Sequence, residues 1–429
     1  MRIIADLHLH SKYSRATSPQ MDVQRLAAFA KVKGIGLIGT GDFTHPEYFT
    51  EIKRALAPFR GDSSTGLYER DGVLFMPTAE VSCIYSVPGK GLKRVHVCAC
   101  APSLEAAEQA NDLLARRGAK LASDGRPILG MSVPALTEMF MGVSRDFLVY
   151  PAHAWTPWFG ALGSESGFDS IEDCFEDQAK NVFALETGLS SDPPMNWRVS
   201  SLDKYCLLSN SDAHSLEKIG RECNVFELAE KEISYDAIMK AIKTKDKTRL
   251  RMTVEFFPEE GKYHWDGSRN CGVSMPPEEA VKCGNKCPHC NGGLTLGVLH
   301  RVQALADRPD GFVPPTAIPF IHLVPLAEVL AEALGTKGKL LTETYLKMVA
   351  EFGSEFEALT AAKPDGLKRY GARVAEAVLR VREGKVTVKP GYDGVFGEVH
   401  IFSEGATPEG KRAEAAKSSG QKGMAGWMQ

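Results

Sequence analysis

Two histidines one residue apart, His8 and His10 in the stretch ADLHLHSKYS, are the first residues of this chain whose types and spacing could do chemistry. The apolar run before them predicts a short buried strand, and side chains two positions apart on a strand point to the same side. His8 and His10 can therefore converge on one ligand. A single pair of this kind also occurs where histidines only satisfy hydrogen bonds at a strand end, so the rest of the chain must decide.

Further residues able to bind metals stand at the ends of other apolar runs. The full set, in chain order, is Asp6, His8, His10, Asp42, His45, Glu80, His96, His153, Glu186, Asp212 and His214. Clustered carboxylates and imidazoles are costly to bury without a ligand, so their recurrence predicts a site for two or three divalent metals. Mixed nitrogen and oxygen ligands do not distinguish zinc, manganese, iron or magnesium. Adjacent cations favour phosphoester hydrolysis, because they bind phosphate oxygens and activate water.

Seven apolar, strand-like runs have to position these residues. They are RIIADLHLH, GIGLIGTGDFTH, GVLFMPTAEVS, RVHVCACAP, FLVYPAHAWTP, VFALETGLSSDP and YCLLSNSDAHS. In α/β barrels, functional groups gather at the carboxyl ends of the strands, where the strand-to-helix loops converge. The pattern therefore predicts an α/β barrel over residues 1–255. Between the runs, MDVQRLAAFAKVKG predicts a helix with Asp22 near its start and Gly34 at its end.

The order of these motifs, from HxH near the start to DxH at 212–214, resembles the PHP (polymerase and histidinol phosphatase) superfamily. The resemblance implies a distorted seven-stranded β/α, TIM-like barrel with a trinuclear metal site. It implies that the metal ligands are His8, His10, Glu80, His96, His153, Asp212 and His214, with His8, His10, Glu80, Asp212 and His214 catalytic.

The second motif departs from the superfamily's adjacent Thr-Asp-His, because Phe43-Thr44 separates Asp42 from His45. We expect Asp42 to be a ligand. The sequence leaves open whether His45, Asp6 and Glu186 touch metal, and Asp6 is a candidate to orient a histidine from behind.

A second metal site is predicted by four cysteines in a short Gly-rich stretch, Cys271, Cys283, Cys287 and Cys290. The CxxC pair and the two preceding cysteines have the spacing of a four-thiolate structural zinc site. Buried free thiols are the alternative. We expect one structural zinc in a small module at residues 256–300, with His264 and His289 as substitute ligands.

The joined segments resemble the endonuclease Q family in particular. They are the PHP-type barrel followed by WDGSRNCGV, CPHCNGGLTLGVLHRVQALADRP, GSEFEALTAA and PGYDGVFGEVHIF, and the resemblance extends to about residue 403. It implies a DNA repair endonuclease that cuts 5′ to deaminated bases (uracil, hypoxanthine and xanthine) and to abasic sites. The implied partner is damaged DNA.

Such an enzyme must extrude the damaged base, because the altered Watson–Crick edge is hidden inside the stack. The segment HAWTPWF, directly after His153, offers aromatic candidates to open the stack or bind the base, namely Trp155, Trp158 and Phe159. Arg269 and Arg301 are candidates to contact DNA, as is the basic run at 243–251. Loop packing explains the aromatics equally well, and a solvated surface explains the charge run.

Composition limits the remaining choices. A chain of 429 residues favours two or three domains, and 43% apolar with 24% charged residues is ordinary for a globular protein. A net charge of −3 neither requires nor excludes DNA as a partner. No apolar run is long enough to span a membrane and no secretion leader is evident, so we expect a cytoplasmic protein.

The last part of the chain is predicted to be a helical C-terminal domain at 301–403 and a flexible tail at 404–429. In the tail, the spacing of Gln421, Met424 and Trp427 resembles that of sliding-clamp-binding peptides, so a sliding clamp is a candidate partner. A frayed terminus without function is the alternative.

Two other functions fit parts of the sequence. A PHP-type small-molecule phosphoesterase would use the same metals but has no need of the cysteine module. A non-catalytic DNA-binding scaffold would tolerate lost ligands, whereas each ligand position that we identify is filled.

Overall fold

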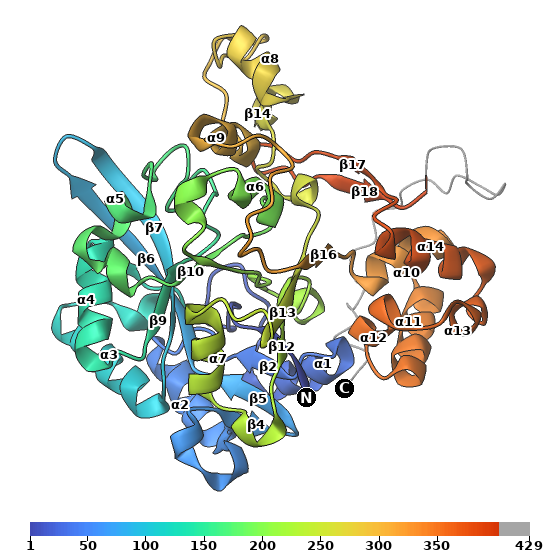
Figure 1. Cartoon of the computed structure of the whole chain (residues 1–429), viewed down its shortest axis with the longest axis horizontal. Coiled ribbons are helices and arrows are strands. Elements are labelled where there is room, and N and C mark those ends of the chain that lie inside the picture. The colour runs from blue at the N-terminus through green and yellow to red at the C-terminus, as the bar shows by residue number, and fades with distance from the viewer. Residues whose placement is uncertain (403–429) are drawn as a thin grey trace. The chain divides into compact units, whose positions relative to one another are not determined.

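The computed structural model describes residues 1–402 (Figure 1). The predicted tail at 404–429, with the clamp-binding candidates Gln421, Met424 and Trp427, lies outside the described residues. The chain divides into two compact units. Unit 1 comprises Met1–His322 and Lys389–Glu398, and unit 2 comprises Leu323–Val388 and the chain from Val399.

The largest sheet of unit 1 is mixed, since β1, β2 and β5 pair in parallel whereas β12 pairs with β1 in antiparallel fashion. Its strands, in spatial order, are β16 (Phe320–His322), β13 (Leu250–Glu255), β12 (Cys223–Glu227), β1 (Arg2–Asp6), β2 (Leu37–Gly39), β5 (Val73–Met76), β4 (Tyr68–Arg70) and β3 (Ala57–Pro58).

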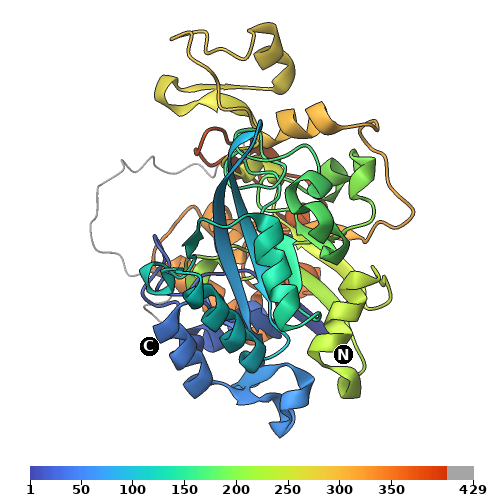
Figure 2. The ribbon, with the colours of Figure 1, turned by 90° about the vertical axis from the view of Figure 1, so that its left-hand side faces the viewer.

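A second sheet is built around the long antiparallel hairpin of β6 and β7, which Figure 2 shows nearly edge-on. Its strands, in spatial order, are β8 (Ile128–Leu129), β6 (Thr78–Val87), β7 (Gly91–Cys100) and β9 (Leu148–Pro151). Two short pairs complete unit 1, the parallel β10 (Ala184–Glu186) with β11 (Cys206–Leu208) and the antiparallel β14 (Asp266–Ser268) with β15 (Val273–Met275).

Each of the seven predicted runs contains a strand, but the strands are divided among three sheets. In residues 1–402 no continuous hydrogen-bonded ladder closes them into one barrel. A regular β/α barrel needs successive parallel strands, whereas β6 and β7 pair antiparallel from Thr78↔Cys100 to Val87↔Gly91. The predicted mixed α/β class is therefore confirmed, and the single seven-stranded barrel is not.

The helices of unit 1 separate these strands in sequence. They are α1 (Val23–Lys33), α2 (Pro46–Ala55), α3 (Leu104–Arg116), α4 (Val133–Val143), α5 (Ile171–Phe175), α6 (Pro193–Trp197), α7 (Tyr235–Lys243), α8 (Pro277–Lys282) and α9 (Val298–Leu305). Helix α1 has the predicted bounds, because the Asp22 side chain accepts from the Arg25 N–H and Gly34 ends the helix at φ 88°.

Unit 2 contains the helices predicted from the sequence. They are α10 (Leu326–Leu334), α11 (Lys339–Phe352), α12 (Glu355–Thr360), α13 (Pro364–Lys368) and α14 (Ala372–Arg382). The Arg382 guanidinium donates to the Ala358 and Ala362 carbonyls, which stabilises the end of α12 against α14. The chain passes between the units at β17 (Thr387–Lys389) and β18 (Glu398–His400).

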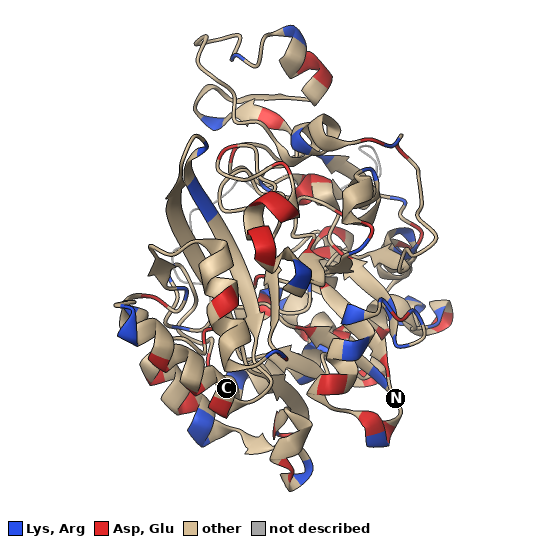
Figure 3. Ribbon diagram, turned by 60° about the vertical axis from the view of Figure 1, so that its left-hand side comes forward, with Lys and Arg blue, Asp and Glu red and all other residues tan. Residues whose placement is uncertain are grey.

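Charge is not segregated on the ribbon, where Lys and Arg are interspersed with Asp and Glu (Figure 3). Part of the basic run at 243–251 is engaged locally, since Lys245 donates to the Asp203 carbonyl and Arg249 pairs with Glu232. Within residues 1–402, no helix combines the length and apolar character needed to cross a membrane.

Candidate active site

The HxH and DxH segments lie side by side at the end of β1. Leu9 forms a parallel bridge with Ala213, and this bridge is flanked by two backbone hydrogen bonds. The His10 N–H donates to the Ala213 carbonyl and the Asp212 N–H donates to the His8 carbonyl, each at 2.9 Å. Asp212 has a φ of 46°, in the left-handed region that Asp tolerates better than most residues. The backbone therefore holds His8, His10 and Asp212 on one site.

Glu80 and His96 reach this site from the long hairpin. Glu80 of β6 is paired with Cys98 of β7, and His96 lies two residues from Cys98, so both side chains project from the same face of the hairpin. His153, which follows β9, joins them with a φ of 28°. Strained backbone at Asp212 and His153 is typical of residues held for function.

Four predicted ligands converge as a first group, His8, His10, Glu80 and Asp212. Oε2 of Glu80 lies 3.0 Å from His10 Nε2 and 3.5 Å from His8 Nε2. Oδ1 of Asp212 lies 3.1 Å from His10 Nε2. Nε2 of both histidines and Oδ1 of Asp212 are buried, and none has a well-formed hydrogen bond to the described chain. Buried, convergent and unsatisfied atoms of this kind fit a bound cation.

The other oxygen of Glu80 faces a second group. Oε1 lies 2.7 Å from His96 Nδ1 and 3.2 Å from His153 Nε2. The opposite nitrogen of His153, Nδ1, is hydrogen-bonded to the Thr156 hydroxyl at 2.8 Å, which fixes the ring. Glu80 therefore has one oxygen beside each of two groups that would hold cations.

Two carboxylates lie behind the HxH histidines. Glu186 contacts His8 Nδ1 with both oxygens at 3.0 Å, and Asp42 Oδ1 contacts His10 Nδ1 at 3.1 Å. Such contacts hold the ring and leave Nε2 as the metal-binding atom. Oδ2 of Asp42 accepts from the Ser11 N–H and hydroxyl, both at 2.6 Å. Asp42, which we expected to be a ligand, is therefore placed behind His10 as an orienting group.

His214 and His45 occupy different surroundings. His214 Nδ1 is hydrogen-bonded to the Asp212 carbonyl at 2.9 Å, and its ring centroid lies 4.5 Å from that of His10. His45 caps α2, where its Nδ1 accepts from the Tyr48 N–H at 3.5 Å, and its ring stacks on Tyr13. His214 borders the first group, whereas His45 belongs to neither group.

Asp6 is not directed at a histidine ring. Its carboxylate accepts from the backbone N–H groups of Ser211 at 3.1 Å and Gly220 at 2.9 Å. Burial raises the pKa of Asp6 to about 6. Asp6 therefore fixes the loop that carries Asp212.

The electrostatics of the first group favour ionised carboxylates. Burial alone would raise the pKa of Glu80, but His96, Arg126 and His8 hold it well below its usual value. Burial lowers the pKa of His96 to about 4, so this imidazole is neutral at pH 7. His96 belongs to the second group. In the first group burial lowers the pKa of His8 and His10, but acidic neighbours raise it well above the usual value, so a cation that binds there would displace a proton from each ring.

A cavity of about 380 Å³ adjoins both groups. Its lining includes His96, His153, Asp212 and His214, the cationic Arg126, Arg221 and Lys262, and the aromatic Trp158, Phe159, Tyr263 and Phe396. The Phe159 ring lies over His96 at 4.3 Å between centroids, and Trp158 packs edge-on against Tyr263 at 5.9 Å. A cavity with aromatic walls, cationic groups and convergent metal ligands is suited to a nucleotide.

Of the three aromatic candidates, Trp155 lies elsewhere. It is 1% exposed, and its Nε1 donates to the Asn196 side chain at 2.7 Å. Trp155 therefore belongs to the core, and the expectation that it could contact DNA is corrected. Trp158 and Phe159 do line the cavity.

The two arginine candidates lie outside this cavity. Arg301 of α9 donates to the Leu162 and Phe168 carbonyls and pairs with Asp169, so its side chain ties α9 to the loop that follows Phe159. The backbone N–H of Arg269 donates to Asp393 at 2.8 Å. Arg301 thus has a structural role, and contacts of Arg269 and Arg301 with DNA stay predictions.

Sequence reasoning missed the five other charged or aromatic side chains of the cavity wall, namely Arg126, Arg221, Lys262, Tyr263 and Phe396. Arg126 is the most directly placed, since its Nη1 donates to Glu80 Oε2 at 3.0 Å. The sequence carried only a weak signal for two of these residues. Arg126 lies in the turn-forming segment SDGRP just before β8, and Phe396 lies in the segment PGYDGVFGEVHIF.

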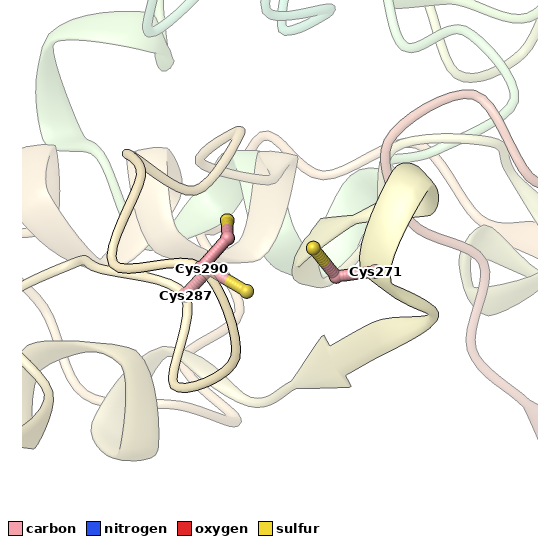
Figure 4. Close-up of side chains that lie close together, drawn as sticks. All are labelled: Cys271, Cys287 and Cys290. Atoms are coloured by element: carbon pink, nitrogen blue, oxygen red, sulfur yellow. The ribbon is translucent and has the colours of Figure 1, made fainter.

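Three of the four predicted zinc ligands gather in the module after β14. The sulfur atoms of Cys271, Cys287 and Cys290 lie within 4.8 Å of one another (Figure 4). Cys283, at the end of α8, is exposed and outside the group. A backbone hydrogen bond from Cys290 lowers the pKa of Cys287, which favours the thiolate form that zinc binds.

The C-terminal helical region matches a known domain family, and the whole chain matches solved structures. Residues 325–385 match the MJ0043 C-terminal domain. The chain is 34% identical over 255 residues to the uncharacterized protein MJ0043 of Methanocaldococcus jannaschii. The aligned region covers 58% of this chain and 31% of that protein. It is 29% identical over 413 residues to the uncharacterized protein YqxK of Bacillus subtilis. This aligned region covers 93% of this chain and 99% of that protein.

Two solved structures match at nearly full length. The lesion-specific endonuclease PfuEndoQ from Pyrococcus furiosus has a TM-score of 0.82 and 33% identity, over 94% of this chain and 96% of its own. An endonuclease Q bound to a 27-mer duplex substrate with an abasic lesion at the active site has a TM-score of 0.83 and 32% identity, over 94% of this chain and 98% of its own. On this agreement of sequence and structure, the chain belongs to the endonuclease Q family.

Proposed function

We propose that this protein is a metal-dependent DNA repair endonuclease that hydrolyses the phosphodiester 5′ to deaminated bases and abasic sites. The observation that carries the proposal is the position of Glu80, whose two oxygens face two separate histidine groups beside an aromatic and cationic cavity. Membership of the endonuclease Q family and the duplex bound to one relative support DNA as the substrate.

The first group, His8, His10, Glu80 and Asp212, and the second group, Glu80, His96 and His153, are the residues that would hold the catalytic metals. When bound, divalent cations there supply charge stabilisation to the phosphate and lower the pKa of water. Asp42 and Glu186 orient the HxH histidines from behind. Hydrolysis adds one water molecule across one P–O bond and leaves one hydroxyl end and one phosphate end.

The cavity gives the damaged nucleotide a place outside the helix stack. Trp158 and Phe159 offer apolar ring faces next to the metal-binding groups, so an extruded base can stack there while its 5′ phosphate lies over Glu80. An abasic site needs no base to be removed from the stack, which lowers the cost of extrusion. Both lesion classes therefore fit one site.

The remaining parts have proposed roles in binding. A structural zinc on Cys271, Cys287 and Cys290 would fix the module at 256–300, and Arg301 ties the helix after this module to the cavity-side loop. The helical domain expected at 301–403 would be limited to unit 2, because residues 301–322 and 389–398 belong to unit 1. Clamp binding through Gln421, Met424 and Trp427 stays a proposal for recruitment to DNA.

The experiment compares four substrates with and without a chelator. The substrates are duplexes with one abasic site, with one deoxyuridine and without a lesion, and a phosphomonoester. We expect incision of both lesion duplexes at one position, 5′ to the lesion, and its loss with chelator. Cleavage of the phosphomonoester alone, or equal cutting of the undamaged duplex, would overturn the proposal.

A further inference from the structure

Arg126 is held beside the metal-binding groups by a fixed turn. The Gly125 N–H donates to the Tyr13 carbonyl at 3.0 Å, and the Thr44 hydroxyl donates to the Gly125 carbonyl at 3.0 Å. The Pro127 carbonyl accepts from an N–H of β6 at 3.0 Å. These contacts on both sides of Arg126 leave its backbone little freedom.

The turn passes close to the group that orients His10. A Cβ atom at Gly125 would lie 2.2 Å from Asp42 Oδ2 and 2.3 Å from the Ser14 hydroxyl. Atoms that belong to buried, hydrogen-bonded side chains cannot move aside by the distance required. Only glycine fits before Arg126, and its missing side chain lets the turn pass this close to Asp42.

The Arg126 side chain is shared between Glu80 and the cavity. Its Nη1 donates to Glu80 Oε2 at 3.0 Å, the same oxygen that faces His10 Nε2. A guanidinium carries five N–H donors, and this contact uses one of them. The side chain is 27% exposed and forms part of the cavity wall with Asp212 and His214. Arg126 therefore keeps N–H donors beyond its contact with Glu80, in a side chain that lines the cavity.

The chemistry of that position calls for a cation. Hydrolysis of a phosphodiester concentrates negative charge on the non-bridging oxygens, and preorganised donors in a partly buried cavity stabilise this charge strongly. Arginine suits the task better than lysine, because its planar fork matches two phosphate oxygens and it is always charged.

We propose that Arg126 is a catalytic residue that binds a non-bridging oxygen of the scissile phosphate while Glu80 holds its guanidinium in place. This inference rests on the proposed function. The competing role is structural, in which Arg126 only neutralises Glu80. A structural role would alter metal binding, whereas a phosphate contact would depend on the charge of the phosphate.

The first test measures single-turnover incision of the abasic duplex by Arg126→Gln and Arg126→Lys. We expect Arg126→Gln to be about 100-fold slower or worse, with bound metal unchanged, and Arg126→Lys to recover part of the rate. The control is Arg15→Gln, which removes an 86% exposed arginine that pairs with Asp124 in the same turn. Its rate should stay within about twofold of wild type, since exposed pairs contribute little.

The second test measures affinity for a duplex with a neutral methylphosphonate at the scissile position. The Asp212→Asn variant and the Asp212→Asn, Arg126→Gln double variant are compared, so that incision does not interfere. The neutral group should weaken binding about tenfold when Arg126 is present and hardly at all with Arg126→Gln. Equal weakening in both backgrounds, or wild-type incision by Arg126→Gln, would overturn the inference. If the wild-type protein incises no lesion duplex at all, the proposed function is wrong, which is distinct from a failure of the inference about Arg126.

Discussion

Oε2 of Glu80 lies 3.0 Å from Nε2 of His10, and both groups are buried. His10 presents its other nitrogen to Asp42, while Glu80 presents its other oxygen to His96. His10 therefore sits at the boundary between an outer layer that orients and an inner layer that binds, whereas Glu80 lies within the inner layer, between two metal-binding groups. This division predicts different consequences for substitutions that look similar in sequence.

Asp42→Asn tests that division. Because Asp42 contacts His10 Nδ1 and two serines, the variant should weaken metal binding by about 10 to 100-fold and leave incision recoverable at high metal concentration. Asp212→Asn changes a group that faces His10 Nε2, so its incision should not recover at high metal concentration. Metal titration of incision separates the two, and identical behaviour of the variants would place Asp42 among the ligands.

The two tryptophans after His153 should behave differently. Trp158→Ala removes a cavity wall, so we expect it to slow incision of a paired deoxyuridine more than of the same lesion in single-stranded DNA, where unstacking is already cheap. Trp155→Phe removes a buried hydrogen bond to Asn196 and should lower stability by about 1 kcal/mol without changing that ratio. The rate ratio for the two substrates is the measurement. An unchanged ratio in Trp158→Ala would reject its role in extrusion.

Zinc content tests the cysteine module. Cys287→Ser should lose the structural zinc, because its sulfur is buried within the three-cysteine group, and DNA affinity should fall more than the stability of the rest of unit 1. Cys283→Ser should lose less zinc, since Cys283 is exposed outside that group. Equal loss of zinc in the two variants would indicate that Cys283 is the fourth ligand.

Stability should fall as pH rises through neutrality, owing to two buried carboxyl groups. Burial raises the pKa of Glu255 from 4.5 to about 7 and raises that of Glu222 well above its usual value. A raised folded-state pKa means that the folded protein binds the proton more tightly than the unfolded chain. The stabilisation is therefore complete below about pH 4.5 and is lost as pH rises through 7.

Glu255→Gln removes one of these titrations. Between pH 5 and 7.5 the wild-type free energy of unfolding, measured in urea with chelator, should fall by about 1 to 3 kcal/mol more than that of Glu255→Gln. Glu227→Gln changes an exposed carboxylate and should follow the wild type. Parallel curves for wild type and Glu255→Gln would contradict the prediction.

The sequence was sufficient to predict the features that depend on a residue's own strand or helix. Strand ends, helix α1 and the convergence of His8, His10, Glu80 and Asp212 follow from patterns that local sequence carries. The prediction of a single closed barrel was not confirmed, because β6 and β7 form an antiparallel hairpin where parallel strands were expected. Whether a strand pairs in parallel or antiparallel fashion depends on its neighbouring strands, and the pattern of apolar residues does not indicate it.

Roles within the site were harder to predict, because the same carboxylate type serves in both layers. Asp42 and Asp212 look alike in sequence, and only the three-dimensional surroundings show that one faces serine donors and the other faces histidine Nε2. Arg126 was missed because a single arginine in a turn-forming segment is only a weak signal. Trp155 and Trp158 differ by three positions, yet one is core and the other lines the cavity.

One carboxylate, Glu80, would join two metal-binding groups into a single hydrolytic site. The most direct measurement is metal content per chain together with incision of the abasic duplex for Glu80→Gln, with Glu227→Gln as control. We predict that Glu80→Gln loses more than one catalytic metal and at least about 100-fold in rate, because both groups share this residue. Incision within tenfold of wild type, or loss of no metal, would contradict the account.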